Sequence, residues 1–463
     1  MATPPTVLAA AERGIDAALE QLCRYLRIPA VSCDPRHGPD VRRLAALVCT
    51  DLVALGLEAR VLELDGALPC VAAAWRKAGP QAPTVLIYGH LDLQPVDGGD
   101  GWRTPPHEPT RVGDRLYGRG ASDDMGGWVS HLAAMGAWLE ATGALPCNIR
   151  LIIESEEEIG SGNLERYMDA FPEAFAADAM ILTDCENPST EVPGLTVSLR
   201  GVFEVVVEVA ALEADGHSGL WGNMVPDVST ALMQLVTRLV DGDGRPRVGL
   251  VAQPEQRRRA AAAVPIPDAV ISRGAHLLPG VQPLPARGRS AAEWLWLQPA
   301  ITVVSTTLPT PDRKKNALRA AATAVLSVRL APDQTPAEML AALQAELLRD
   351  PPQGCRVTAT QARGAGLGWS YEPRGPAFAA VDRAYLAAWG HEPVRVGVGG
   401  SIPFVAIFGQ RFGDLPLILN GVMDPESTAH GPNESLHLGV FRKAVLANVH
   451  LYGELAARGV LRG

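Results

Sequence analysis

The segment at residues 84–96, TVLIYGHLDLQPV, places the strongest constraint on what this chain can fold into. Its VLIY run is continuously apolar and favours β structure, which is typical of a strand buried on both faces. Gly89 ends the run, and His90 and Asp92 follow two residues apart, so in an extended chain their side chains point the same way. In an open α/β sheet, ligands bind just beyond the carboxyl ends of the strands. A His and an Asp placed there can serve a metal site, with the imidazole as ligand and the carboxylate orienting the ring.

Carboxylates follow other predicted elements in the same manner. A helix predicted at 128–139 is preceded by Asp123 and Asp124, for which helix capping is the simpler interpretation. The apolar strand predicted at 148–153 leads into the acidic run ESEEE, and the strand at 179–183 ends at Asp184. Because several separate elements each supply an acid or a His, we expect a shared site. Oxygen-rich ligation with some imidazole suits a pair of divalent ions.

Length and composition limit the class of protein. At 463 residues the chain is expected to form two domains, and 47% hydrophobic with 20% charged residues indicates a globular protein. We expect no membrane span, because no run of about 18 apolar residues occurs, and no signal peptide, because the N-terminus lacks a basic start and an apolar block. The net charge of −10 argues against nucleic-acid binding. Seven scattered cysteines without C-x-x-C spacing favour reduced thiols and a cytoplasmic location over disulfides or zinc–thiolate sites.

The hydrophobic pattern changes in the middle of the chain. Residues 195–210 alternate as a half-exposed strand, with Val205, Val207 and Val209 on one face and Glu204 and Glu208 on the other. After this strand come a helix, two strands, a helix and a strand, interrupted by a Pro- and Arg-rich insertion. This order predicts a small α+β domain at 194–365, inserted into an α/β domain made of 1–193 and 366–463. We expect the α/β domain to have a central, mostly parallel sheet flanked by helices.

A series of motifs gives the chain a family resemblance. They are, in order, GHLDLQPVD, LYGRGASDDMGG, IIESEEEIGSGNL, ILTDCEN, DGHSGLWGNMVPD, SVRLAPDQTP, GVGGSIP and STAHGPNES. With them the chain resembles, over nearly its whole length, the M20 metallopeptidases, which comprise carnosinase-like dipeptidases, glutamate carboxypeptidases and amino-acid deacylases. The resemblance implies a catalytic domain of the zinc-exopeptidase type, two divalent ions per subunit (zinc first, with Mn or Co as alternatives), and an inserted domain that acts as lid and dimerisation surface of a homodimer.

The same resemblance implies roles for individual residues. Asp92 would steer the general base, Glu157, and the peptide bond between Asp123 and Asp124 would be cis. The implied metal ligands are His90, Asp123 as the bridge, Glu158, Asp184 and His430. His217 would donate to the oxyanion, either within the subunit or from its partner. The implied groups that grip the free carboxylate of the substrate are Arg329, Ser401 and Gly400 with Gly399, where arginine offers a bidentate fork.

These roles lead to one function and two alternatives. We expect a two-metal-dependent hydrolase that cleaves the amide bond of dipeptides or short peptides with a free carboxylate. The first alternative is an N-acyl or N-carbamoyl amino-acid amidohydrolase with the same metal core, and the second is an inactive binding protein. The length of the inserted domain and the HSG-x-x-G pattern favour a dipeptidase, although Met125 and Asn223 depart from the residues common among relatives. His131, inside a predicted helix, is interpreted as structural.

Overall fold

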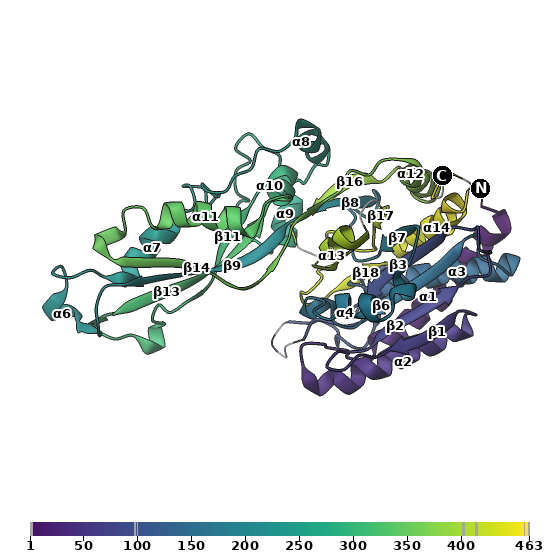
Figure 1. Cartoon of the computed structure of the whole chain (residues 1–463), viewed down its shortest axis with the longest axis horizontal. Helices are drawn as coiled ribbons and strands as arrows, with labels where there is room; N and C mark the ends of the chain where they lie inside the picture. Colours follow the sequence, from purple (N-terminus) through teal and green to yellow (C-terminus); the bar gives the residue numbers. More distant parts are fainter. Residues whose placement is uncertain are drawn as a thin grey trace. The chain divides into compact units, whose positions relative to one another are not determined.

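The computed structural model describes residues 3–96, 99, 101–400, 403–412, 415–457 and 459–461 (Figure 1). The chain divides into two compact units. The first comprises Met1–Val197, Glu372–Val396 and Pro403–Gly463, and the second comprises Ser198–Tyr371 and Gly397–Ile402.

The first unit is built on a mixed sheet with the strand order β1-β2-β6-β3-β7-β17-β8. The central pairs β6/β3, β3/β7 and β7/β17 are parallel, whereas β1/β2, β2/β6 and β17/β8 are antiparallel. The prediction of an α/β unit with a parallel centre is therefore confirmed, and the outer strands make the sheet mixed. The strands are β1 (Glu58–Leu62), β2 (Cys70–Trp75), β3 (Thr84–His90), β6 (Asn148–Glu154), β7 (Ala179–Leu182), β8 (Gly194–Leu199), β16 (Val394–Val398), which also pairs with β8, and β17 (Leu417–Leu419).

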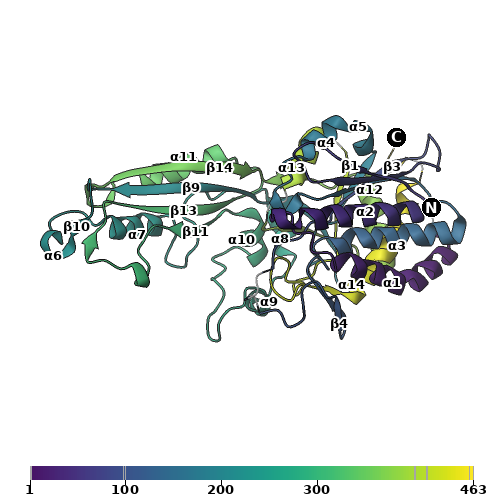
Figure 2. The same cartoon turned by 90° about the horizontal axis from the view of Figure 1, so that it is seen from below.

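Helices cover both faces of this sheet. Figure 2 shows α1 (Pro5–Leu26), α2 (Gly38–Ala54), α3 (Met125–Thr142) and α14 (Leu438–Leu455) on one side, and α4 (Leu164–Ala170), α5 (Pro172–Phe175) and α13 (Pro403–Phe412) on the other. On the α13 side, the Tyr88 ring of β3 lies 4.2 Å from the ring of Phe404. Strand β3 is buried along its length after Thr84, which confirms the prediction of a strand covered on both faces. The helix α12 (Pro376–Trp389) packs against α14.

A small separate sheet supports the loops near the strand ends. It has the order β18-β5-β4 and comprises β4 (Thr110–Val112), β5 (Arg115–Tyr117) and β18 (Ser435–His437). Through it, a C-terminal segment pairs with the loop that precedes α3.

The second unit contains an antiparallel sheet with the order β11-β13-β9-β14. Its strands are β11 (Ala300–Thr306), β13 (Ala321–Leu330), β9 (Gly201–Ala210) and β14 (Arg356–Gly366). The helices α7 (Val228–Arg238) and α11 (Pro336–Leu347) pack on one face. Val205, Val207 and Val209 are buried in the core beneath these helices, and Glu204 and Glu208 are exposed. The predicted one-sided sheet is confirmed.

Two parts of the second unit differ from the sequence prediction. The single strand predicted at 195–210 is divided into β8 and β9 at Arg200. A Cβ on Gly201 would lie 2.7 Å from the Gly366 oxygen, so the neighbouring backbone approaches this point too closely for an ordinary residue. The Pro- and Arg-rich insertion contains three helices, α8 (Glu255–Ala262), α9 (Asp268–Gly274) and α10 (Ala291–Leu297). Further short elements are α6 (Ser218–Trp221), β10 (Gly216–His217), β12 (Ala317–Leu318) and β15 (Trp369–Ser370).

No helix in the described part of the chain has both the length and the apolar character that crossing a membrane requires.

The burial of His131 makes the stability of the first unit depend on pH. His131 lies on α3 and is 1% exposed, with its Nδ1 2.8 Å from the Tyr452 hydroxyl on α14. Burial lowers the pKa of His131 to about 3, against about 6.5 in an unfolded chain. Between these values the unfolded state binds a proton that the folded state does not. The contribution of His131 to stability is therefore complete above about pH 6.5 and is lost as the pH falls towards 3, by up to about 1.4 kcal/mol per pH unit.

We therefore predict that His131→Asn unfolds with a shallower pH dependence than the wild type. The measurement is the urea midpoint between pH 5 and 7. His391→Asn, a substitution at an exposed position, is the control and should keep the wild-type slope. An unchanged slope in His131→Asn would show that this imidazole does not titrate as its burial requires.

Candidate active site

The parallel strands of the first unit bring the predicted metal ligands to one edge of the sheet. His90 is the last residue of β3, and Asp184 lies two residues after the end of β7. Glu157 and Glu158 lie in a short 3-10 turn, η2 (Glu157–Ile159), that follows β6. Because β6, β3 and β7 run in the same direction, the residues after their carboxyl ends share one edge.

Two groups of side chains there can each hold a metal ion. Potential ligand atoms lie within 4.8 Å of one another in each group. The first group comprises His90, Glu157 and Asp184, and the second comprises Asp123, Glu158 and His430. All five predicted ligands and Glu157 are thus brought together.

Asp123 connects the two groups. One of its carboxylate oxygens lies 3.2 Å from His90 Nε2 and the other lies 3.1 Å from His430 Nε2. His430 Nε2 also lies 3.3 Å from Glu158. A carboxylate with an imidazole from each group on its two oxygens has the placement that a bridging ligand needs.

Asp92 anchors the turn that carries the two glutamates. Its Oδ1 accepts a hydrogen bond from the backbone N–H of Glu157 at 3.2 Å, and its Oδ2 accepts one from that of Glu158 at 3.1 Å. Its backbone oxygen lies 3.1 Å from His90 Nδ1, which orients that ring. Asp92 is fully buried, so it fixes the base candidate and a ligand candidate together.

The acids at and just after the end of β6 make different contacts. Glu154 accepts hydrogen bonds from the hydroxyls of Tyr88 and Ser161. Glu156 accepts a hydrogen bond from the backbone N–H of Leu68. Glu154 therefore connects β6 to β3 and to Ser161, and Glu156 holds the loop at Leu68, which leaves the two acids of η2 for the metal groups.

The pKa shifts in the site show that its carboxylates need positive charge to compensate them. Burial opposes a charge on His90, but hydrogen bonds to Asp123 and Asp92 outweigh this effect and raise the pKa of His90 well above its usual range. Hydrogen bonds to Asp123 and Glu158 raise the pKa of His430 to about 10. Burial raises the pKa of Glu157 to about 8, and burial followed by the charge of Asp123 raises the pKa of Asp184.

Divalent cations fit this donor set. Without them, protons on the histidines and carboxyls compensate the buried negative charge. A cation can replace those protons, because metal ligands must be deprotonated to bind. Carboxylate oxygens with imidazole nitrogens are ligand types that suit zinc, manganese and cobalt.

Asp124 packs behind the site in a space that glycines create. The Asp123–Asp124 peptide bond is cis, as the family resemblance implied. Asp124 accepts a hydrogen bond from the Thr183 hydroxyl at 2.7 Å, and burial raises its pKa to about 7. A Cβ on Gly89 would lie 2.6 Å from Asp124 Oδ2, and one on Gly127 would lie 2.2 Å from its Oδ1. Asp124 thus fills the space that is open because Gly89 and Gly127 have no side chains.

Sequence reasoning missed the pair of residues that holds Asp123 in place. Glu434 is fully buried, and its Oε1 accepts hydrogen bonds from the backbone N–H groups of Ser122 and Asp123, both at 3.1 Å. Its Oε2 accepts one from Arg119 at 2.8 Å, and Arg119 also donates to the backbone oxygen of His430 at 3.1 Å. Arg119 and Glu434 stand inside the motifs LYGRGASDDMGG and STAHGPNES, so the motifs offered a signal for them.

Apart from Asp92, the predicted residues outside the metal groups belong to the second unit. His217 is exposed, ends β10 and caps α6, where its Nδ1 accepts a hydrogen bond from the backbone N–H of Gly219. Arg329 is on β13, and burial lowers its pKa. The backbone oxygen of Gly400 accepts a hydrogen bond from the backbone N–H of Arg200 at 3.1 Å. Ser401 lies outside the described residues.

Arg200 is a further residue of the second unit that the sequence did not single out. It is 8% exposed, and its Nε donates to the Gly399 oxygen at 2.8 Å. Burial, followed by the charge of Arg329, lowers its pKa to about 10. Arg200 therefore fixes the backbone before Ser401 and increases the positive potential at Arg329.

Comparison with known proteins gives a family match. The sequence profile of peptidase family M20/M25/M40 matches residues 86–454. Cysteinylglycine-S-conjugate dipeptidase from Corynebacterium striatum is 30% identical to this chain over 405 residues, which covers 87% of each protein. Human Beta-Ala-His dipeptidase is 33% identical over 258 residues, which covers 52% of this chain and 51% of that protein.

The fold is shared with a solved structure. The crystal structure of human carnosine dipeptidase 1 matches with a TM-score of 0.79 and 24% sequence identity, over 98% of this chain and 100% of that one.

We predict that Glu434→Gln weakens metal binding at the group of Asp123, Glu158 and His430. The amide removes the negative charge that pairs with Arg119, and its NH₂ cannot accept the hydrogen bonds that one carboxylate oxygen accepts. Loss of a residue that orients metal ligands typically costs about 10–100-fold in metal affinity. The measurement is calorimetric titration of metal-stripped protein, with the metal-to-protein ratio determined by elemental analysis.

Glu165→Gln is the control, because Glu165 is an exposed acid on α4. It should bind metal as the wild type does. Wild-type affinity for both ions in Glu434→Gln would contradict the assigned role of this carboxylate.

Proposed function

The chain belongs to peptidase family M20/M25/M40, and from this premise we propose that it is a dipeptidase that uses two divalent metal ions. As a member of this family it is a metallopeptidase that acts on amide bonds. The observation that carries the proposal is the pair of metal-ligand groups joined by Asp123, with Glu157 anchored beside them by Asp92.

The reaction needs a nucleophile and a proton carrier. When bound, divalent ions lower the pKa of water towards neutrality and polarise the carbonyl of the scissile amide. Glu157 takes the proton of the attacking water on its carboxylate and then gives it to the leaving amine, acting first as general base and then as general acid.

Other residues of the first unit orient that base. Asp92 accepts the backbone N–H of Glu157, which fixes the start of η2. Gln94 donates to Glu158 Oε2 at 2.7 Å and so directs the neighbouring carboxylate. His90, Asp123, Glu158, Asp184 and His430 would hold the two ions.

We propose that the substrate is a dipeptide or short peptide with a free carboxylate. Two relatives named as dipeptidases support this substrate class, one for cysteinylglycine conjugates and one for Beta-Ala-His. Arg329, with Gly400 and Ser401, would bind the carboxylate of the substrate, and His217 would donate to the oxyanion. Arg200 supports this role by its contacts with the backbone at 399–400.

Zinc is the metal we propose for the site. Carboxylate and imidazole ligands bind zinc at neutral pH, and manganese or cobalt would fit the same donors. We also propose a cytoplasmic location, supported by seven cysteines that are all unpaired thiols.

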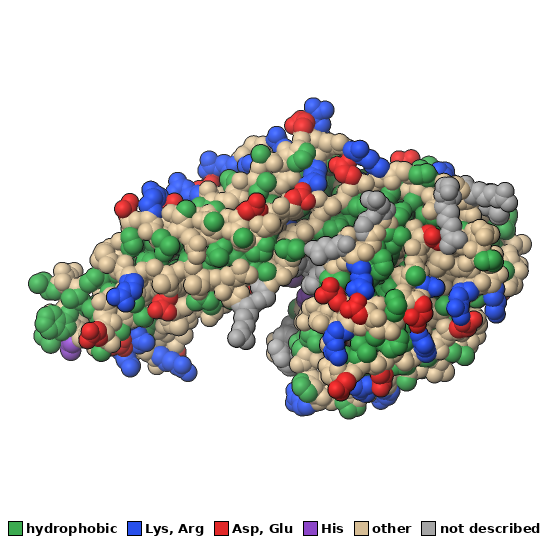
Figure 3. All heavy atoms as spheres, viewed as in Figure 1, with side chains coloured by type: hydrophobic (Ala, Val, Ile, Leu, Met, Phe, Trp, Pro, Cys, Tyr) green, Lys and Arg blue, Asp and Glu red, His purple; other side chains and the backbone are tan. Residues whose placement is uncertain are grey.

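We propose that the protein is a homodimer joined through the second unit. In the described part of the chain, β11 pairs only with β13, so its other edge can accept a strand. Val303 and Val304 on β11 are exposed, and so are Leu220, Trp221 and Met224 at and just after α6. Figure 3 shows hydrophobic side chains gathered at the end of this unit where Figure 1 labels α6. Apolar surface of this kind marks a contact with another protein.

The substrate class is tested by a panel of dipeptides, N-acetyl amino acids and N-carbamoyl amino acids. Metal-stripped protein should be inactive, and zinc or manganese should restore cleavage of the dipeptides. Activity confined to the acyl or carbamoyl substrates would keep the metal chemistry and replace the dipeptidase by a deacylase. No turnover by protein that has bound two ions would favour a binding protein.

The same panel tests the base. Glu157→Gln should still bind both ions but lose about 10²–10⁴-fold in kcat, because the amide cannot take a proton. Retained activity would show that another group is the base. Loss of one ion would show that Glu157 is a ligand.

The dimer is tested by substitution on β11. Val304→Lys should shift the protein from dimer to monomer in light scattering after size exclusion, because a charged side chain on an edge strand opposes pairing with another strand. Val112→Lys is the control, since Val112 on β4 of the first unit is 55% exposed and Val304 is 53% exposed. A wild-type monomer, or a Val304→Lys dimer of unchanged stability on dilution, would contradict this interface.

A further inference from the structure

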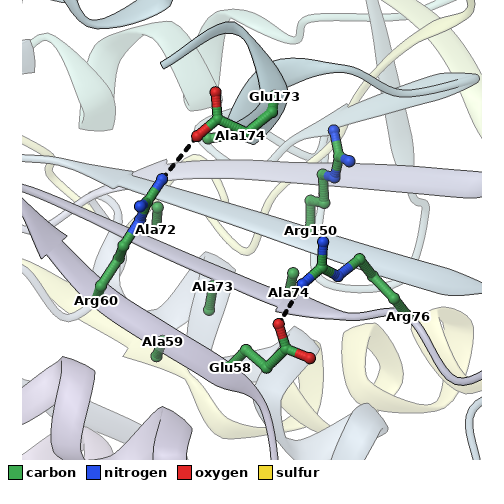
Figure 4. A pocket seen from close by; sticks show the side chains of 10 residues that line it. All are labelled: Glu58, Ala59, Arg60, Ala72, Ala73, Ala74, Arg76, Arg150, Glu173 and Ala174. Atoms are coloured by element: carbon green, nitrogen blue, oxygen red, sulfur yellow. Dashed lines mark hydrogen bonds and ion pairs between the residues drawn. The ribbon is translucent and has the colours of Figure 1, made fainter. Parts of the chain in front are cut away.

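A groove on the first unit lies apart from the metal-ligand groups. It has a volume of about 360 Å³ and is formed by β1, β2, β6 and α5 (Figure 4). None of the residues that line it belongs to either metal-ligand group. The lining residues are Glu58, Ala59, Arg60, Ala72, Ala73, Ala74, Arg76, Arg150, Glu173 and Ala174. A volume of this size is in the range of pockets that bind small molecules.

The groove exists because its floor consists of small side chains. Ala72, Ala73 and Ala74 of β2 lie between longer side chains from the neighbouring strands, as Figure 4 shows. Ala72 and Ala74 share the face on which the neighbouring strand presents Arg60 and Glu58, because side chains alternate along a strand. Their short side chains leave this face of the sheet low at this point. The floor is apolar and suits the hydrocarbon part of a ligand.

Two arginine–glutamate pairs stand on either side of the alanines. Arg60 lies 2.7 Å from Glu173 and 5.6 Å from the centre of the Phe171 ring. Arg76 is paired with Glu58. The side chains of both pairs are more than half exposed, and such surface pairs contribute little to stability. Each arginine can therefore turn towards a competing anion at small cost.

Arg150 adds a third positive charge to the groove. Its Nη1 donates to the backbone oxygen of Ala176 at 2.5 Å, and no ion pair joins it to a carboxylate among the described residues. Burial, followed by the charge of Arg76, lowers the pKa of Arg150. In Figure 4 the guanidinium groups of Arg150 and Arg76 stand on the same side of the groove. Three arginines and two glutamates leave the lining with an excess of positive charge.

We propose that this groove binds a small oxyanion, a carboxylate or a phosphate, carried by a compact organic molecule that rests on the alanine floor. Arg150 and Arg76 would bind the anion, because guanidinium forks match the oxygens of carboxylate and phosphate and bind them bidentately. The ligand would relieve the repulsion between the two arginines. Nothing in the proposed peptidase mechanism uses this groove, so the site is additional to the metal centre.

The test is isothermal titration of the metal-loaded protein at low ionic strength with two probes, inorganic phosphate and citrate. The variants are Arg150→Gln and Arg76→Gln. The matched control is Arg13→Gln, because Arg13 is an exposed arginine paired with Glu140 outside the groove. We expect at least one probe to bind the wild type and the control equally, and to bind both groove variants at least tenfold more weakly.

The two probes distinguish the sources of the anion. Arginine-dependent binding of citrate alone assigns the groove to carboxylates, and of phosphate alone assigns it to phosphorylated molecules. Unchanged affinity in both groove variants would place the anion elsewhere, including at the metal ions, and would overturn the proposal. Absence of binding of either probe to the wild type at millimolar concentration would also overturn it. Arg76 is exposed, so its variant keeps the test decisive if Arg150→Gln does not fold.

Discussion

The carboxylate of Asp123, shared between His90 and His430, is the interaction on which the rest of the first unit depends. It requires the end of β3, the start of α3 and a loop near the C-terminus to meet at one point. Each is held by different means. Strand β3 is buried in the sheet, and the C-terminal loop is held by the pairing of β18 with β5. The start of α3 is fixed because Asp124 fits into the space beside Gly89 and Gly127. Buried negative charge at that point is tolerated because imidazoles, protons or cations compensate it.

The buried ion pair of Arg119 and Glu434 holds the segments that carry Asp123 and His430 together. An isolated charge buried here would be costly, but each of these groups is paired and also hydrogen-bonded to the backbone of the site. The pair connects the segment that carries Asp123 to the segment that carries His430, across more than three hundred residues of sequence. Its geometry suits orientation of ligands more than stability as such, since buried ion pairs are often replaceable without loss of stability.

Sequence patterns predicted those features that depend on local periodicity. The buried strand before His90, the acids after β6 and β7, and the alternation around Val205 and Val207 all follow from residue type and spacing. They did not predict the antiparallel outer strands, the break at Arg200 or the pairing of Arg119 with Glu434. These depend on which distant backbone segments approach each other, and a single sequence does not encode that approach in any local pattern. The family motifs supplied the ligand set, because they fix residues whose partners are far apart in the chain.

Strand β6 serves two electrostatic environments of opposite sign. Its carboxyl end leads to Glu157 and Glu158, while Arg150 near its middle faces the groove with a net positive lining. The chain carries a net charge of −10, which at long range repels anions. At about 0.1 M salt, however, charges beyond about 10 Å are largely screened, so the local arginines decide what the groove attracts. Because the metal groups attract cations and the groove attracts anions, charged ligands of opposite sign are directed to different parts of one sheet.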